Sequence, residues 1–96
     1  MKKQNTVILK DVIEELIRKE GLEEGLLRIR LYDLWDEMLG AIVARNTRNK
    51  YVKDRKLIVE LDSSVVRNQL FVMRREIVAQ LNKRLGKNII DEVILK

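Results

Sequence analysis

The 96-residue sequence contains no cysteine and no histidine. Without cysteine it can form no disulfide and offers no thiolate as a nucleophile or metal ligand. Without histidine it lacks the commonest general base and a common ligand of transition metals. It also lacks the glycine-rich loop ending in Lys-Ser or Lys-Thr that cradles nucleotide phosphates. We therefore expect a protein that acts by binding and not as an enzyme, with no catalytic residues, no cofactor and no metal site.

Long apolar runs are missing as well. No stretch approaches the roughly 18 consecutive apolar residues of a membrane span, and the first residues do not form the apolar centre of a signal peptide. Apolar residues nevertheless make up 46% of the chain, which suffices for one core at this length. We expect a single domain over residues 1–96, with residues 1–6 as a flexible tail, in the cytoplasm and without membrane contact.

The charge is unevenly distributed along the chain, whose net charge is +5. Residues 1–40 carry seven Lys or Arg and nine Asp or Glu, a net of −2, whereas residues 41–96 carry thirteen and six, a net of +7. Such an asymmetry concentrates positive potential on one part of a fold. It favours a polyanionic partner such as nucleic acid.

The spacing of apolar residues predicts six elements. A 3.6-residue period indicates helices over residues 7–20, 22–45 and from Ser63 or Ser64 to Leu85, and glycines at 21 and 86 are suited to end the first and last of them. Alternating or β-branched segments indicate strands near residues 50–52, 56–62 and 89–95. The expected order is helix, helix, strand, strand, helix, strand.

A strand, a helix and a second strand favour a right-handed crossover, so the last strand should run parallel to residues 56–62. Residues 50–52 and 56–62 should form an antiparallel hairpin. The expected fold class is therefore α+β, in two layers, with the helices packed on one face of a three-stranded mixed sheet.

Five residues stand out as structural anchors. Trp35 lies on the apolar row of the second helix, so we favour a place in the core over a platform for stacking bases. Gly40 in the middle of that helix predicts that another backbone packs closely there. The main apolar row of the third helix includes Leu70, Ile77 and Leu81, which we assign to the core.

The strongest functional signal is a group of cations around the predicted hairpin. Lys and Arg can neutralise phosphates, and an aromatic ring among them offers a stacking face to an unpaired base. The alternative is an edge hairpin whose charges prevent sheet-to-sheet aggregation. The candidate nucleic-acid-binding residues are Arg45, Arg48, Lys50, Tyr51, Lys53, Arg55 and Lys56.

A second basic group follows along the third helix. Two of its arginines interrupt the apolar face, where their stems can lie along the edge of the core. Those nearer the end of the helix also complement the helix dipole. This possible secondary surface comprises Arg67, Arg74, Arg75, Lys83, Arg84 and Lys87.

Several of these features together resemble a known bacterial family. They are Trp35 followed by Gly40, the alternating Leu57, Val59 and Leu61, then Leu70, the pair Leu81-Asn82 and the pair Leu85-Gly86. In this pattern the chain resembles the DciA family of replicative-helicase loaders over nearly its whole length. The resemblance implies a KH-like domain that contacts the replicative helicase and DNA.

The chain departs from that family in places. Relatives often have a proline after the second helix and a glycine in the hairpin, where this chain has Asn49 and Arg55, so the geometry of these turns is in question. The Gly-x-x-Gly loop of true KH domains is absent. Many relatives also carry a long basic extension, and we expect any DNA binding that depends on it to be missing here.

We therefore expect a non-catalytic DNA-replication accessory protein that binds the replicative helicase and single-stranded or forked DNA. One alternative is an RNA-binding KH-like module associated with the ribosome or RNA metabolism. Another is a protein-interaction domain whose acidic first helix is the docking surface.

Overall fold

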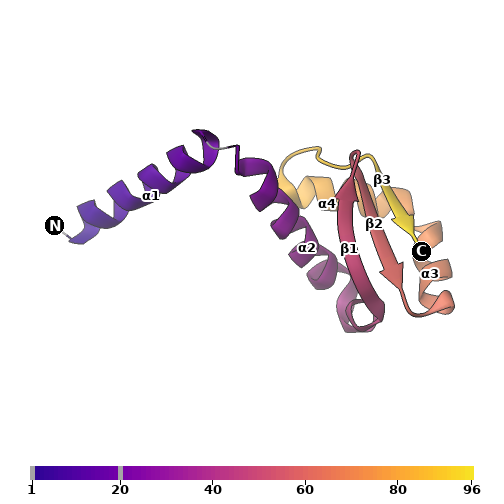
Figure 1. The fold of residues 1–96 in the computed structure, drawn as a ribbon. Helices are drawn as coiled ribbons and strands as arrows, with labels where there is room; N and C mark the ends of the chain where they lie inside the picture. Colours follow the sequence, from indigo (N-terminus) through magenta and orange to yellow (C-terminus); the bar gives the residue numbers. More distant parts are fainter. Residues whose placement is uncertain (1, 20) are drawn as a thin grey trace.

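The computed structural model describes residues 2–19 and 21–96 of the chain (Figure 1). Its order is helix, helix, strand, strand, helix, helix, strand, which confirms the predicted α+β class. The elements are α1 (Lys2–Lys19), α2 (Glu23–Asn46), β1 (Thr47–Lys53), β2 (Lys56–Leu61), α3 (Ser64–Val72), α4 (Arg74–Leu85) and β3 (Glu92–Leu95).

The three strands form one mixed sheet in the order β1-β2-β3. β1 and β2 are antiparallel, with Val52 opposite Leu57 and Lys50 opposite Val59. β2 and β3 are parallel, with Leu57 opposite Val93, so the predicted direction of the last strand is confirmed. Because opposite residues share a face of the sheet, this register determines which side chains meet the helices.

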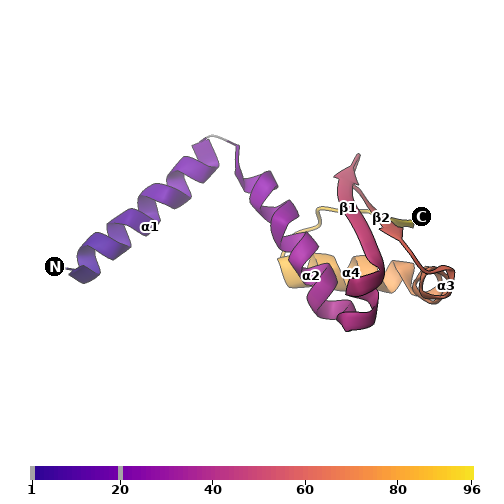
Figure 2. The same ribbon diagram turned by 60° about the horizontal axis from the view of Figure 1, so that its bottom comes forward.

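The helices α2, α3 and α4 cover one face of the sheet and leave the other uncovered (Figure 2). The core lies between these two layers. It consists of Leu31, Leu34 and Trp35 of α2, Leu57, Val59 and Leu61 of β2, Val66, Leu70, Ile77 and Leu81 of α3 and α4, and Ile90 and Val93 near β3. This is the predicted two-layer, KH-like arrangement.

The single long helix predicted after the hairpin is two helices. Ser63 caps the first, since its Oγ accepts a hydrogen bond from the backbone nitrogen of Val66 at 3.2 Å. The break falls at Met73, whose φ of −101° and ψ of 5° are not helical. An unbroken helix of about 20 residues would be roughly 30 Å long, whereas strands of four to seven residues are no longer than about 23 Å. Leu70 before the break and Ile77 after it are both buried in the core.

The prediction for Gly40 is wrong. Gly40 is exposed, and a Cβ placed on it would meet nothing within 4 Å, so no backbone packs closely there. The residue instead has φ 88° and ψ 172° and introduces a kink into α2. That region of backbone conformation is essentially restricted to glycine. The glycine therefore permits the kink, after which the last turn of α2 leads into β1.

The first helix stands away from the rest of the molecule (Figure 1). The radius of gyration is 16.4 Å, whereas about 12.5 Å is typical of a compact chain of this length. α1 begins at Lys2, so residues 2–6 of the predicted flexible tail are helical, while Met1 lies outside the described residues. No helix in the described part of the chain is long and apolar enough to cross a membrane.

Candidate nucleic-acid interface

The hairpin that carries most of the predicted cations ends in an unusual turn. Asp54 and Arg55 have φ angles of 51° and 62°, so both central residues are left-handed. Two left-handed residues define the type I′ turn, which suits the right-handed twist of a hairpin but is normally made by Asn-Gly or Asp-Gly. An arginine in this conformation is strained, so contacts elsewhere must hold Arg55 in place.

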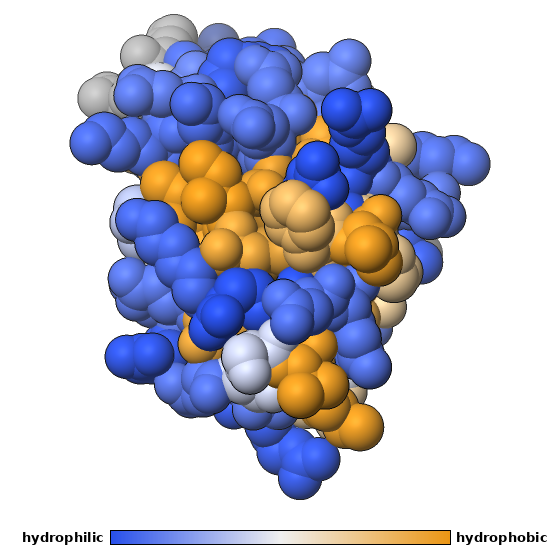
Figure 3. Space-filling model, turned by 90° about the vertical axis from the view of Figure 1, so that its right-hand side faces the viewer, coloured by the Kyte–Doolittle hydropathy of each residue, from blue (hydrophilic) through white to orange (hydrophobic). Residues whose placement is uncertain are grey.

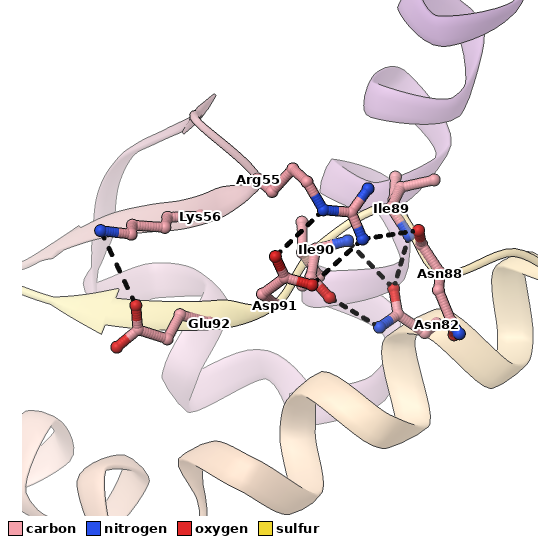
Figure 4. A network of polar contacts seen from close by, with 8 residues as sticks. All are labelled: Arg55, Lys56, Asn82, Asn88, Ile89, Ile90, Asp91 and Glu92. Atoms are coloured by element: carbon pink, nitrogen blue, oxygen red, sulfur yellow. Dashed lines mark hydrogen bonds and ion pairs between the residues drawn. The ribbon is translucent and has the colours of Figure 1, made fainter.

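Arg55 has such contacts with the segment before β3 (Figure 4). Its Nε and Nη2 donate to the two carboxylate oxygens of Asp91 at 3.0 and 3.1 Å, and Nη2 also donates to the carbonyl of Asn88 at 3.0 Å. The backbone nitrogen of Asp91 donates to the carbonyl of Arg55 at 2.7 Å. The hydrogen bond from Arg55 holds the pKa of Asp91 below its usual value, and Asp91 raises the pKa of Arg55. Arg55 thus links the hairpin turn to the loop between α4 and β3 by hydrogen bonds.

Asn82 on α4 makes hydrogen bonds to the backbone of the same loop (Figure 4). This side chain is buried, its Nδ2 donates to the carbonyl of Ile90 at 2.8 Å, and its Oδ1 accepts from the backbone nitrogens of Ile89 and Ile90 at 3.1 and 3.3 Å. Gly86 follows in a left-handed conformation with φ 76°, which ends α4. The Leu81-Asn82 and Leu85-Gly86 pairs therefore shape one loop.

Lys50 faces the helices and not the solvent side of the sheet. Its Nζ donates to the carbonyl of Tyr32 at 3.0 Å and lies 2.9 Å from Oδ2 of Asp36, and its side chain is only 16% exposed. These contacts tie β1 to α2. A side chain so placed is poorly accessible to a phosphate, so the structure separates Lys50 from the rest of the predicted group.

The uncovered face of the sheet brings other members of the group together. Tyr51, Ile58 and Ile94 are paired across the three strands, and Ile58 is only 7% exposed although no helix covers that face. On the same face, the next cross-strand pair toward the hairpin turn is Lys53 with Lys56. This face therefore presents a half-buried aromatic ring and an apolar row beside two exposed lysines.

Carboxylates accompany several of these cations. Nζ of Lys56 lies 3.9 Å from Oε2 of Glu92, which is its partner across the β2–β3 pair. At the far end of the hairpin Nε of Arg48 lies 3.0 Å from Oδ1 of Asp62, and the two side chains are 65% and 53% exposed. Ion pairs this exposed contribute little to stability, so a phosphate can compete for their cations.

Two cations of the group have no such partner in the described part of the chain. Lys53 and Arg45 are both exposed, and neither lies within 4.0 Å of a described carboxylate. Lys53 lies at the turn end of the hairpin, whereas Arg45 belongs to the last turn of α2, next to the start of β1. Accessible positive charge is thus present at both ends of the hairpin.

The predicted secondary basic residues do not form one surface. Arg74 lies with Cζ 4.0 Å from the centre of the Phe71 ring, and its Nη1 donates to the carbonyl of Phe71. The Nε of Arg67 is buried without a hydrogen-bond partner among the described residues. Nζ of Lys87 lies 4.0 Å from Oε1 of Glu23 on α2. The others, Arg75, Lys83 and Arg84, are exposed along α4.

Trp35 lies outside any candidate interface. It is 0% exposed, and its Nε1 donates to Oγ1 of Thr47 at 3.1 Å. The Thr47 hydroxyl donates in turn to the carbonyl of Val43 at 2.7 Å. Trp35 therefore packs in the core and orients the start of β1, and it offers no ring face to a base. Among residues 2–19 and 21–96, no group of Asp and Glu side chains is arranged to hold a metal ion.

Sequence reasoning missed two functional features of this region. Asp91 and Asn82 were not singled out as the residues that position the hairpin turn and the loop. A buried polar residue next to Leu81 on an apolar row is a signal that could have identified Asn82, because a buried amide needs partners. Nothing local marks Asp91, since Arg55 is 36 residues away.

The chain is similar to known proteins over most of its length. A family model described as "Dna[CI] antecedent, DciA" matches residues 8–95. A UPF0232 protein of Corynebacterium glutamicum (strain R) is 31% identical over 85 residues, which cover 88% of this chain and 48% of that protein. The chain therefore spans about half the length of this curated relative.

Proposed function

The chain belongs to the DciA family, and from this membership we propose that it is a non-catalytic accessory protein of DNA replication. The proposed partners are the replicative helicase and single-stranded or forked DNA. The family match over residues 8–95 is the observation that carries this proposal. It fits a chain without cysteine or histidine, whose net positive charge lies beyond residue 40.

The proposed DNA site is the uncovered face of the hairpin together with its two ends. Tyr51 supplies a ring for a base, and Lys53 and Lys56 lie beside it for phosphates. Arg48 and Arg45 extend the positive charge toward the end of α2. Lys50 and Arg55 are left out of the contact set, because their side chains hold β1 to α2 and the hairpin turn to the α4–β3 loop.

A salt titration with matched variants tests the DNA site. If three or four cations contact the phosphates of a single strand, the slope of log affinity against log salt should be roughly −2 to −3, a loss of about 15- to 50-fold between 50 and 200 mM. Replacing Arg48, Lys53 and Lys56 by glutamine should make this slope shallower by about 2. Fluorescence anisotropy with a short single-stranded oligonucleotide measures it.

The matched control has the same net charge and a different surface. Replacing Arg75, Lys83 and Arg84 by glutamine also removes three positive charges, but from the exposed side of α4. This variant should keep most of the parental slope. If both variants bind like the parent, the hairpin charges only protect an edge, and the proposed DNA site is wrong.

The helicase partner is tested by affinity capture from a bacterial lysate, with and without nuclease. We expect the replicative helicase to be retained after nuclease treatment, since the proposed contact is between proteins. Capture of ribosomal proteins that disappear with nuclease would instead support an RNA-binding module. The purified protein should not hydrolyse ATP, and activity that remains after contaminants are removed would contradict the non-catalytic role.

A further inference from the structure

Two apolar surfaces in the first third of the chain have no cover in the described structure. On α1, Leu9, Val12, Ile13 and Leu16 lie on one side of the helix and are 47% to 62% exposed. At the start of α2, the N-cap residue Leu22 and the helix residues Leu26 and Ile29 are 47% to 58% exposed. They point away from Leu31 and Trp35, which face the core. Seven large aliphatic side chains are thus presented to water on two consecutive segments.

The α2 surface is a shallow groove suited to another helix. It has a volume of about 440 Å³ and is lined by Leu22, Gly25, Leu26, Arg28, Ile29 and Tyr32. Gly25 lacks a side chain, and a Cβ there would meet only the tip of Arg28, at 3.9 Å. Glycine inside a helix costs about 1 kcal/mol relative to alanine. An open position of this kind lets a second helix approach closely.

The apolar row of α1 fits that groove in register. Gly21, with φ 68°, separates the two helices. Leu16 lies five residues before Gly21 and Leu26 five residues after it, while Ile13 and Ile29 lie eight residues before and after. Both helices rise 1.5 Å per residue, so these side chains meet at the same height when an α1 lies antiparallel along α2 as if joined to it through Gly21, whichever chain supplies that α1. Leu9 and Tyr32 complete the row.

The charges beside the two apolar rows are complementary in the same arrangement. Glu15 borders the α1 row near its middle, six residues before Gly21. Arg28 lines the α2 groove, seven residues after Gly21. Antiparallel pairing places Glu15 beside Arg28. Opposite charges that line an apolar seam set the orientation in which helices pair.

We propose that α1 of one chain binds the α2 groove of a second copy, and that the exchange is reciprocal. α1 projects away from its own domain, which places its apolar row where another molecule can meet it (Figure 1). The seven side chains present on the order of 600 Å² per chain, so a reciprocal pair buries about 1,200 Å², the lower limit for stable interfaces. Exchange of one element between identical chains is a common route to a closed dimer.

The absence of cysteine allows a direct test. One full-length chain carries Ile13→Cys, a second carries Ile29→Cys, and the two are mixed and oxidised under mild conditions. A disulfide-linked heterodimer is the expected product, because the exchange places Ile13 of one chain opposite Ile29 of the other. Mixing Ile13→Cys with Val72→Cys is the control. Val72 is 80% exposed at the end of α3. That helix lies at the opposite end of the molecule from α1 in Figure 1, on the side that faces the viewer in Figure 3, so this pair should give little cross-linking.

The mass in solution gives an independent measurement. Light scattering should show a dimer for the parent. Leu16→Glu or Leu26→Glu should raise the dissociation constant of the dimer by at least about tenfold. Val72→Glu should leave it unchanged. A monomeric parent at all concentrations would overturn the proposal. So would a disulfide within single chains of the double variant Ile13→Cys, Ile29→Cys at high dilution, because α1 would then fold back on its own α2. These outcomes are independent of DNA and helicase binding.

Discussion

Arg55 and Asp91 are 36 residues apart and are joined by two hydrogen bonds between one guanidinium and one carboxylate, at 3.0 and 3.1 Å. Arg55 lies in a left-handed turn that ordinarily needs glycine. The two side chains are 53% and 66% exposed, so their ion pair alone adds little stability. Together with the hydrogen bonds from Arg55 to the Asn88 carbonyl and from the Asp91 backbone nitrogen to the Arg55 carbonyl, it positions the turn beside the α4–β3 loop. Arg55 thus has a structural role, whereas the sequence alone indicated only a candidate for nucleic-acid binding.

This contact leads to a prediction about substitutions of Arg55. Both Arg55→Ala and Arg55→Gly remove the guanidinium, but only glycine adopts the left-handed conformation without strain. We expect both variants to melt below the parent, with the alanine variant lower than the glycine variant. Thermal unfolding followed by circular dichroism measures the order. An alanine variant as stable as the parent would show that the contact with Asp91 does not stabilise the fold.

The lowered pKa of Asp91 predicts a pH dependence. A carboxyl group whose pKa is lower in the folded than in the unfolded state contributes stability that is fully present above its unfolded pKa of about 3.9. That contribution is lost as the pH falls through the folded pKa. The difference in melting temperature between the parent and Asp91→Asn should therefore be constant near neutral pH and shrink below about pH 4. A constant difference down to pH 2 would contradict the role assigned to the charge.

Asn82 should be more sensitive to substitution than other polar residues of the helices. Asn82→Ala leaves the Ile90 carbonyl and the nitrogens of Ile89 and Ile90 without their partner in a buried place. The expected loss is about 1 to 3 kcal/mol in the free energy of unfolding. Urea denaturation measures it, with Asn68→Ala on the exposed side of α3 as the control. Equal effects at the two sites would mean that water replaces the hydrogen bonds that Asn82 makes with the loop backbone.

Trp35→Ala should reduce the free energy of unfolding by roughly 3 to 5 kcal/mol, the usual effect of removing a large buried aromatic side chain. Trp35→Phe should cost less, because it keeps most of the buried surface and loses only the hydrogen bond to Thr47. Urea denaturation distinguishes the two. If Trp35→Ala folds normally but loses nucleic-acid binding, the residue is a stacking platform and its place in the core has been misjudged.

Tyr51 is the residue whose substitution should separate binding from folding. Tyr51→Leu keeps an apolar cover over Ile58 but removes the ring, whereas Tyr51→Phe keeps the ring. If a base stacks there, the leucine variant should lose about 1 to 3 kcal/mol of binding free energy and the phenylalanine variant much less. Fluorescence anisotropy with single-stranded DNA measures both. Equal affinities for the two variants would exclude stacking at this position.

The sequence predicted most of the fold because its signals are local or follow general rules. The period of Leu57, Val59 and Leu61 identified β2 and its buried face, and the crossover rule predicted the direction of β3. The break at Met73 has no local signal, because neither proline nor glycine lies nearby. Leu70 and Ile77 also keep the seven-residue spacing of one helical face across the break, so the apolar pattern gives no sign of it.

The candidate site was harder to predict. Alternation along β1 places Lys50 and Tyr51 on opposite faces, but which face meets the helices depends on the pairing of Lys50 with Val59. The pairing of Arg55 with Asp91 depends on the position of a loop 36 residues later. Gly40 was predicted to mark close packing and instead permits a kink in α2. A glycine within a helix can serve either purpose, and the sequence does not distinguish them.

The parallel pairing of β2 with β3 also affects how the protein is made. β2 is the central strand, and its partner β3 follows only after α3 and α4 have been synthesised. Val93 completes the core from β3. While the chain is still on the ribosome, the edge of β2 that β3 later occupies stays unpaired, and Leu57 and Val59 lack part of their cover. The sheet can close only once Leu95 has left the exit tunnel, and until then the nascent domain offers an open strand edge to chaperones and to other chains.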